Sequence, residues 1–412
     1  MISTSLKLSE NAALRSLGTH PFQHLAALLD GIDPPSALTP IDLTIGEPTS
    51  RPPEWTAAAL SEDSASFGTY PPNGGPAWFN DAVIDWAERR FGIPRQAMDR
   101  AAVVPTAGAR EALFQLALAV EGPRSGRDLV VMPTPHYAPY RAAAAFPGFS
   151  VLPLAADASN GNLPTPDMLP VGVAQRVALT YLCSPSNPEG AVADKQRLGR
   201  AIEHARRHGY LLVVDECYSE IYRNEPPTSA LAVAAGLAAA PSEDLFRNVV
   251  VVNSLSKRSS AAGLRVGWVA GDRHIVDSLV RARSYIGGST PLPNLRAAAR
   301  LYTDEGHVER IRQGYCDAFD ASDSVLQDVE GYRSPAAGMF LWHQVGDGET
   351  VARRAWRDAG VRLVPGEYLG PAGHDGRHPG RSHVRLAMAC PRPLIEEALD
   401  RLHPILQDEG RA

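Results

Sequence analysis

The sequence predicts an α/β fold: a three-layer α/β/α domain with a mostly parallel central sheet, and a smaller α+β domain beside it. Two observations predict it. Between about residues 101 and 270, short β-branched apolar runs alternate with Ala- and Leu-rich helical stretches. The runs are almost continuously apolar, as strands covered on both faces of a parallel sheet are. The expected strands are Ala102–Val104, Leu129–Met132, Val177–Leu182, Leu211–Val214, Val249–Val252 and Val266–Ala270.

The length of 412 residues exceeds one ordinary core and predicts two or more domains. Residues 1–50 are expected to form an N-terminal arm and a segment of the small domain. This part contains one amphipathic stretch, Phe22–Leu29, and a Pro-rich connector over residues 33–40. Residues 51–300 would form the large domain. Residues 301–412, where the pattern mixes helix and strand, would complete the small domain.

The composition is that of a globular protein, with 44% hydrophobic and 21% charged residues. The net charge of −6 gives no reason to expect a nucleic-acid or anionic-membrane partner. No apolar run approaches the ~20 residues of a membrane span. The polar stretch Met1–Glu10 lacks the apolar core of a signal peptide, so a cytoplasmic location is expected. The four cysteines form no CxxC pair, and reduced thiols without a metal site are expected.

Polar residues follow three of the apolar runs. Val249–Val252 leads into Asn253–Lys257, Leu211–Val214 into Asp215–Tyr218, and the strand ending at Leu182 into a Ser/Asn/Pro turn. Sheets of this class bind ligands at the carboxyl ends of their strands. We therefore expect these residues to converge on one site.

Lys257 is the residue around which this site is expected to form. An isolated lysine after a strand is usually solvated. This one stands beside two hydroxyls, Ser254 and Ser256, and Arg265 follows eight residues later. Hydroxyls and a guanidinium suit a bound phosphate, and a desolvated amine close to cations can lose its proton and attack a carbonyl.

Asp215, Tyr218 and Asn187 are the next candidates. A carboxylate at a strand end would pair either with a structural arginine or with a protonated pyridine nitrogen. Tyr218, three residues on, is either a half-buried packing residue or a donor to a cofactor's phenolic oxygen. Asn187 lies in an Asn-Pro turn and could bond that oxygen and a substrate carboxylate.

Two further features are weaker on their own. The turn Thr106–Glu111 joins a strand to a helix, and Gly108, Ala109 and Arg110 would present backbone N–H groups to an anion. Tyr137 is either a core aromatic or a stacking partner for a ring. The histidines at 374, 378 and 383 lie in a Gly/Pro-rich loop without a recognisable ligand spacing, so no metal is expected.

Taken together, these motifs make the chain similar to the class I/II aminotransferases, which are pyridoxal 5′-phosphate (PLP) enzymes of fold type I. The resemblance covers about residues 20–400. Within the class, the chain looks most like N-succinyldiaminopimelate aminotransferases. The matching stretches are Ile45–Pro48, Tyr70-Pro71, Gly108–Leu113, Ser186–Gly190, Asp215–Tyr222, Ser254–Ser259, Gly263–Gly267 and Val384–Leu386, with His20–Phe22.

The resemblance implies roles around PLP. Lys257 would form the Schiff base with the cofactor and move the proton between the substrate Cα and the cofactor. Asp215 would pair with the pyridinium, while Asn187 and Tyr218 would bond the phenolic oxygen and Tyr137 would stack on the ring. The phosphate would be held by Gly108, Ala109, Arg110, Ser254, Ser256 and Arg265.

The resemblance also implies how substrate and subunits meet. Arg385 would bind the substrate α-carboxylate, with help from Gly46 and Asn187. Tyr70 would reach the phosphate in the neighbouring subunit's site, which implies a homodimer with shared active sites. The implied reaction moves an amino group between an amino acid and a 2-oxo acid, with a substrate of the N-succinyldiaminopimelate type or a related one.

Some residues depart from the family pattern. Glu189 replaces the usual Thr, Ala107 the usual Asn, and residues 259–263 read Ser-Ser-Ala-Ala-Gly; Gly287-Gly288 is an unusually Gly-rich pair. The substitutions at Glu189, Ala107 and Gly287-Gly288 motivate an alternative, a PLP-dependent β- or γ-elimination or replacement enzyme. A PLP-binding regulator is a further alternative, against which the lack of a basic helix-turn-helix segment argues.

Overall fold

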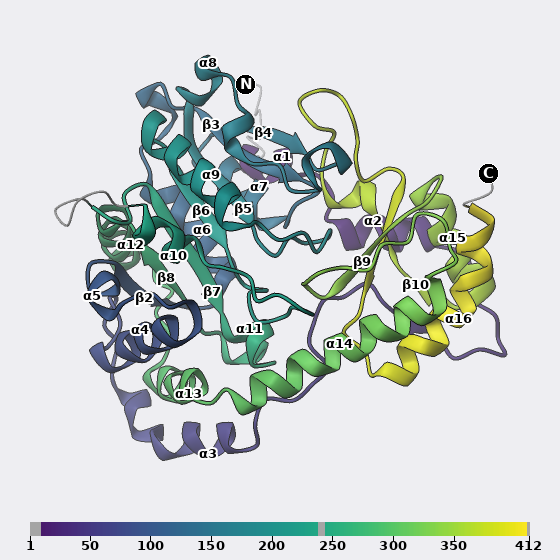
Figure 1. Cartoon of the computed structure of the whole chain (residues 1–412), viewed down its shortest axis with the longest axis horizontal. Coiled ribbons are helices and arrows are strands. Elements are labelled where there is room, and N and C mark those ends of the chain that lie inside the picture. The colour runs from purple at the N-terminus through teal and green to yellow at the C-terminus, as the bar shows by residue number, and fades with distance from the viewer. Residues whose placement is uncertain (1–9, 238–243, 410–412) are drawn as a thin grey trace, which may run out of the picture.

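A seven-stranded sheet forms the centre of the larger part of the molecule (Figure 1). The structure is a computed structural model that describes residues 10–237 and 244–409. The strand order is β2-β8-β7-β6-β5-β3-β4, and only β8 runs antiparallel to its neighbours. The predicted mostly parallel α/β sheet is thereby confirmed. The strands are β2 (Ala102–Thr106), β3 (Leu129–Thr134), β4 (Ser150–Ala155), β5 (Val177–Cys183), β6 (Leu211–Asp215), β7 (Val249–Ser254) and β8 (Gly267–Gly271).

Helices cover both faces of this sheet because successive strand residues point to opposite sides. On β6, Leu212 and Val214 join one hydrophobic core, and Leu211 and Val213 join the other. The first core is closed by α4 (Ala77–Phe91), α9 (Lys195–His208), α10 (Ala230–Gly236) and α13 (Leu292–Thr303). The second is closed by α6 (Ala109–Ala119), α7 (Pro139–Ala145) and α12 (Arg273–Ile286). The result is the expected three-layer arrangement.

A separate hydrophobic core lies in the smaller part of the molecule, at the right of Figure 1. It joins N-terminal and C-terminal segments, as a parallel pair between Ile41 and Val361 shows. The boundaries expected at residues 50 and 300 stay predictions. The elements here are α2 (Pro21–Leu29), β1 (Ile41–Asp42), α14 (Gly306–Leu326), β9 (Phe340–Gln344), α15 (Gly348–Ala359), β10 (Val361–Arg362), β11 (Val364–Pro365), β12 (His383–Ala387) and α16 (Arg392–Glu409).

Short helices link these parts. α1 (Ala12–Leu17) contacts α7, where the Arg141 side chain donates to the backbone oxygen of Ser16 at 2.6 Å. The remaining helices are α3 (Trp55–Glu62), α5 (Arg95–Met98), α8 (Val171–Ala174) and α11 (Leu255–Arg258). α11 follows β7 directly and carries Lys257, so the lysine stands at the carboxyl end of a central strand.

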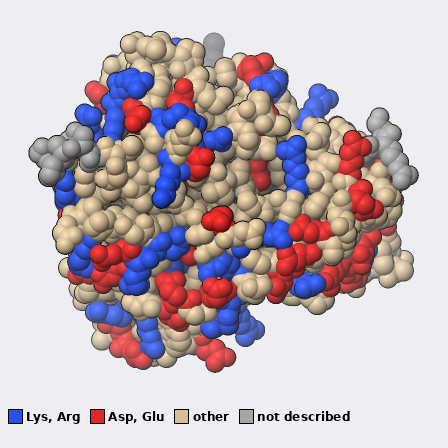
Figure 2. All heavy atoms as spheres, in the orientation of Figure 1, with Lys and Arg blue, Asp and Glu red and all other residues tan. Residues whose placement is uncertain are grey.

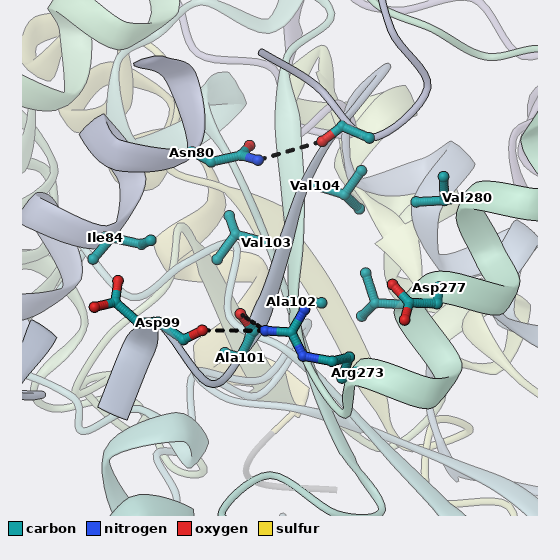
Figure 3. Close-up of a pocket in the computed structure, with 12 residues that line it drawn as sticks. Asn80, Ile84, Asp99, Ala101, Ala102, Val103, Val104, Arg273, Asp277 and Val280 are labelled. Carbon is teal, nitrogen blue, oxygen red and sulfur yellow. Dashed lines mark hydrogen bonds between the residues drawn. The ribbon is translucent and has the colours of Figure 1, made fainter. Parts of the chain in front are cut away.

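The outer edge of the sheet at β2 borders a hollow of about 330 Å³, shown in Figure 3. Its walls come from α4, on which Asn80 and Ile84 lie, and from α12, on which Arg273 lies. Arg273 donates to the carbonyl of Asp99 at 3.1 Å, and the buried Arg283 donates to that of Pro105 at 2.6 Å. Of these two carbonyls, that of Pro105 lies on the edge strand β2, and an arginine bound there hinders pairing with another strand.

Charges of both signs are interspersed over the face seen in Figure 2, and acidic side chains gather over α14 and α16. This agrees with the net charge of −6. Across residues 10–237 and 244–409, no helix is both long and apolar enough to cross a membrane.

Candidate active site

Lys257 is the third residue of the short helix α11, which begins where β7 ends. Ser254 begins this helix because its side chain accepts a hydrogen bond from the backbone N–H of Ser256 at 3.1 Å. The Lys257 ammonium donates to the carbonyl of Gly46, a residue of the N-terminal segment. Burial lowers the pKa of Lys257 to about 8, although the nearby Cys217 and Glu47 oppose this shift. At neutral pH roughly a tenth of such amines is neutral, far more than for an ordinary lysine.

Asp215 ends β6, next to β7, and its carboxylate is 4% exposed. Oδ1 accepts the backbone N–H of Cys217 at 3.1 Å, and Oδ2 accepts the hydroxyl of Tyr140 at 2.8 Å. Burial raises the pKa of Asp215, and the hydrogen bonds from Cys217 and Tyr140 act in the opposite direction. The site thus offers an oriented carboxylate that can pair with a cationic ring nitrogen.

The expected phosphate donors gather where β7, β8 and α6 meet. Ser254 and Ser256 share a hydrogen bond between their hydroxyls at 2.8 Å. Arg265 donates to the carbonyl of Ala107 and to Glu111, both at 2.8 Å. Among the residues that the structure describes, no side chain caps the start of α6 after Gly108, so its first backbone N–H groups have no such partner there.

Gly108 shapes this cradle. Its φ of 90° is a conformation that favours glycine, and a Cβ there would lie 2.5 Å from Nη2 of Arg265. The guanidinium thus rests against the backbone at the turn before α6. Hydroxyls, a guanidinium and helix N-terminal N–H groups are the donors that suit an anion, so the predicted phosphate site is chemically consistent with this arrangement.

Arg385, Asn187 and Tyr218 form a chain of contacts on the other side. Arg385 Nη1 donates to Asn187 Oδ1 at 3.3 Å, and Asn187 Nδ2 donates to the Tyr218 hydroxyl at 3.4 Å. Arg385 also donates to the carbonyl of Thr44 at 2.8 Å, and its guanidinium lies 4.4 Å from the ring centre of Phe340. Burial lowers the pKa of Arg385 to about 10.

One nitrogen of the Arg385 guanidinium lacks a hydrogen-bond partner among the described residues. Arg385 is buried, and its Nε has no hydrogen-bond partner among the residues that the structure describes. A buried donor without a partner is unfavourable. A bound carboxylate would satisfy it.

Tyr137 contacts the site through two neighbours. Its hydroxyl accepts from Arg110 Nε at 3.0 Å, and its ring meets that of Tyr140 edge-on at 5.8 Å between centroids. The structure therefore brings together the predicted Lys257, Asp215, Asn187, Tyr218, Arg385, Gly46 and Tyr137, and the phosphate donors Gly108, Ala109, Arg110, Ser254, Ser256 and Arg265. Their chemical roles stay predictions.

Tyr70 is the predicted site residue that the single chain does not place beside the others. It lies between α3 and α4 with its side chain 98% exposed. Its expected role in the site of a second subunit stays a prediction.

The departures from the family pattern occupy different places. Burial raises the pKa of Glu189 to about 7, and Ser186 is its hydrogen-bonding neighbour. Gly288 has a φ of 94°, and a Cβ there would lie 2.8 Å from Nε2 of Gln115 on α6. Ala107 contributes its backbone carbonyl, which accepts from Arg265. The close approach to Gln115 explains Gly288, whereas nothing in the structure explains alanine at position 107, because every residue offers a backbone carbonyl.

Sequence reasoning missed Tyr140, Cys217 and Glu111 as neighbours of the site. Tyr140 follows Tyr137 by three residues, a spacing that places two side chains on one face of a helical turn. That spacing was the available signal for Tyr140. The approach of Glu111 to Arg265 depends on how α6 meets β8 and leaves no trace in the local pattern.

His374 and His378 lie in the loop before β12, whereas His383 lies on β12, two residues before Arg385. His374 donates its backbone N–H to the carbonyl of Pro153 on β4 at 3.0 Å. Within the described parts of the chain, no three His, Cys, Asp or Glu side chains are placed to hold a metal ion.

Comparison with known proteins identifies the family. The model of the class I and II aminotransferases matches residues 39–402. The chain belongs to this family and is a PLP-dependent aminotransferase.

Among characterised relatives, the chain is 32% identical over 367 residues to 4-dedimethylamino-4-oxo-anhydrotetracycline transaminase of Streptomyces rimosus, covering 88% of this chain and 92% of that protein. It is 32% identical over 364 residues to a probable aminotransferase of Mycobacterium tuberculosis, covering 88% and 80%. It is 29% identical over 376 residues to LL-diaminopimelate aminotransferase of Desulforudis audaxviator, covering 89% and 90%.

Solved structures agree with the fold. An aminotransferase from Neisseria meningitidis superimposes with a TM-score of 0.88 at 29% identity, covering 96% of this chain and 100% of that one. A probable N-succinyldiaminopimelate aminotransferase from Thermus thermophilus gives a TM-score of 0.79 at 26% identity, covering 93% and 100%. The expected fold type I architecture is confirmed.

Proposed function

We propose that this enzyme transfers an amino group between an amino acid of the N-succinyldiaminopimelate type, or a related one, and a 2-oxo acid. One observation carries the proposal. Lys257, with its pKa lowered to about 8, contacts Gly46 in the same site in which the buried Arg385 keeps one donor without a described partner. An amine that can exchange protons thus lies near a group suited to an α-carboxylate.

The residues present fit PLP. The anion cradle at Gly108 and Arg265 suits its phosphate, Asp215 suits its ring nitrogen, and Asn187 and Tyr218 suit its phenolic oxygen. When bound, PLP supplies an electron-withdrawing ring that stabilises negative charge at the substrate Cα.

The chain's own residues would perform the remaining tasks. Arg385 and Asn187 bind and orient the substrate carboxylate. Lys257 holds a proton removed from Cα and returns it, which its lowered pKa permits near neutral pH. Asp215 keeps a negative charge beside the ring nitrogen.

The substrate class is supported by the relatives alone. Their names include LL-diaminopimelate and N-succinyldiaminopimelate aminotransferases. One relative is named for an oxo-anhydrotetracycline substrate. Arg385 is suited to the α-carboxylate that amino acids share, so it supports an amino acid without selecting its side chain.

The elimination or replacement alternative has weaker support from the structure than from the sequence. Gly288 is explained by its close approach to Gln115. Glu189 and Ala107 are the departures that still favour the alternative. Transamination therefore has the stronger support.

We also propose a homodimer with shared active sites. Large aromatic side chains lie on the surface of the single chain: Tyr70 is 98% exposed, Tyr285 91% and Phe67 61%. Exposed apolar side chains of this size favour an interface.

The reaction is tested by mixing the PLP-loaded enzyme with glutamate and following the cofactor absorbance. We expect conversion of PLP to pyridoxamine phosphate in the wild type. Lys257→Ala should abolish it, whereas Lys195→Ala, which alters an exposed lysine of α9, should leave it unchanged. Release of a 2-oxo acid and ammonia, with no pyridoxamine phosphate formed from any common amino donor, would favour elimination instead.

A further inference from the structure

The Tyr140 hydroxyl contacts the carboxylate of Asp215. Tyr140 lies on α7, and none of its surface is exposed. Its hydroxyl lies 2.8 Å from Oδ2 of Asp215. Sequence motifs and family resemblance assigned no role to this residue.

The direction of this hydrogen bond is fixed. Burial and then the charge of Asp215 raise the pKa of Tyr140 well above its ordinary value, so the phenol keeps its proton. An ionised carboxylate can only accept. Tyr140 therefore donates, and Asp215 receives one donor on each oxygen, from Tyr140 and from the backbone N–H of Cys217.

Packing holds the Tyr140 ring in place. It stacks on Tyr181 of β5 at 4.4 Å between centroids and 3° between planes, and the edge of Tyr137 approaches it at 5.8 Å. The Tyr181 hydroxyl donates to the carbonyl of Leu113 on α6 at 2.7 Å. Tyr140 thus has little freedom to turn its hydroxyl away from Asp215.

We propose that Tyr140 is a positioning residue: it holds the Asp215 carboxylate in the plane and charge state that pair with the ring nitrogen of the cofactor. The inference rests on the proposed function. Each carboxylate oxygen has a second lone pair, so the Tyr140 bond leaves room for a ring N–H. Without this bond, Asp215 would be a buried anion with one donor fewer, oriented by the backbone N–H of Cys217 but no longer by Tyr140.

Tyr140→Phe tests the proposal, because it removes the hydroxyl and keeps the stacked ring. Tyr181→Phe is the matched control: it removes the same atom from the neighbouring buried ring and leaves Asp215 untouched. In the PLP-loaded Tyr140→Phe enzyme, we expect the pH midpoint of the cofactor absorbance to shift by about half a unit or more and kcat to fall about tenfold at similar KM. Tyr181→Phe should keep the wild-type midpoint and kcat.

A double-mutant cycle shows whether Tyr140 acts through Asp215. If it does, Tyr140→Phe added to Asp215→Asn causes no further shift in the midpoint and no further loss of kcat. Equal, additive effects in both backgrounds would overturn the proposal. So would a wild-type midpoint and kcat in a folded, PLP-loaded Tyr140→Phe enzyme.

A second substitution covers the case in which Tyr140→Phe does not fold. Fluorotyrosine at position 140 keeps the ring and hydroxyl but makes the phenol a stronger donor. It should shift the midpoint relative to the wild type, and the same substitution in the Asp215→Asn background should cause no further shift. An unshifted midpoint in the otherwise wild-type enzyme contradicts the proposal. Failure of the wild type to bind PLP through Lys257 would instead refute the proposed function.

Discussion

At the scale of single residues, the proposed phosphate site depends on one close contact. Arg265 adopts a φ of 54°, unusual for a residue with a side chain, and from there its guanidinium reaches the turn at Gly108. The close approach works only because Gly108 has no Cβ. The cradle thus depends on a matched pair of residues that are far apart in sequence.

Gly108→Ala should therefore weaken PLP binding about tenfold or more while the protein stays folded. The added Cβ would lie 2.5 Å from Arg265 Nη2 and push the guanidinium away. Gly126→Ala is the control. Gly126 has the same φ of 90°, and a Cβ added there would meet no described atom within 4 Å. Titration of the apoenzyme with PLP measures both. Equal affinities in the two variants would refute the role of this contact.

At the scale of elements, close backbone contact holds the antiparallel strand β8 against β7. Gly271 ends β8 with a φ of 140°, and a Cβ there would lie 2.2 Å from the carbonyl oxygen of Val249. This contact is between backbones and cannot be relieved by a side-chain rotation. β7 leads directly to Lys257, so the same packing supports the site.

Gly271→Ala should destabilise the fold by about 3 kcal/mol or more, because backbone strain adds to a steric clash. Gly314→Ala should have the opposite effect on stability. Gly314 lies exposed inside α14 with nothing within 4 Å, so alanine should stabilise the helix by about 0.5–1 kcal/mol. Denaturant unfolding measures both changes. A neutral Gly271→Ala variant would contradict the account of β8.

Several features of the fold follow from local pattern, and others do not. The six expected strands appear within two residues of their predicted ends because they are buried on both faces. β4 was not predicted. Pro153 breaks the β-branched pattern of its sequence, and four of its six residues are only partly buried or exposed. In the site, residues that follow strands were predictable, since parallel strands end at one edge. Tyr140 was not, because its contact with Asp215 joins α7 to β6 through space.

At the scale of the whole molecule, the proposed substrate-binding and catalytic residues come from both of its main parts. Arg385 on β12 belongs to the smaller part, and Lys257 follows the central sheet. The segment after Leu369 spans the two: His136 donates its backbone N–H to Leu369, and Thr134 donates its hydroxyl to Pro371. The proposed dimer would add Tyr70 from a second copy.

Mixed dimers of Lys257→Ala and Tyr70→Ala chains test this assembly. If Tyr70 serves the partner's site, each mixed dimer contains one site with both defects and one intact site. Activity should then reappear when the two inactive or weakened variants are mixed, up to about half the wild-type value for the hybrid. No recovery in a hybrid shown to form would place Tyr70 in its own subunit's site or outside any site.

The most direct test of the central claim is to identify the lysine that bonds PLP. The chain has only three lysines, Lys7, Lys195 and Lys257, so the result is unambiguous. The enzyme is incubated with PLP, reduced with borohydride, digested and analysed by mass spectrometry. We predict the phosphopyridoxyl group on Lys257 alone. A label on Lys7 or Lys195 in its place, or no label on Lys257, would contradict the account.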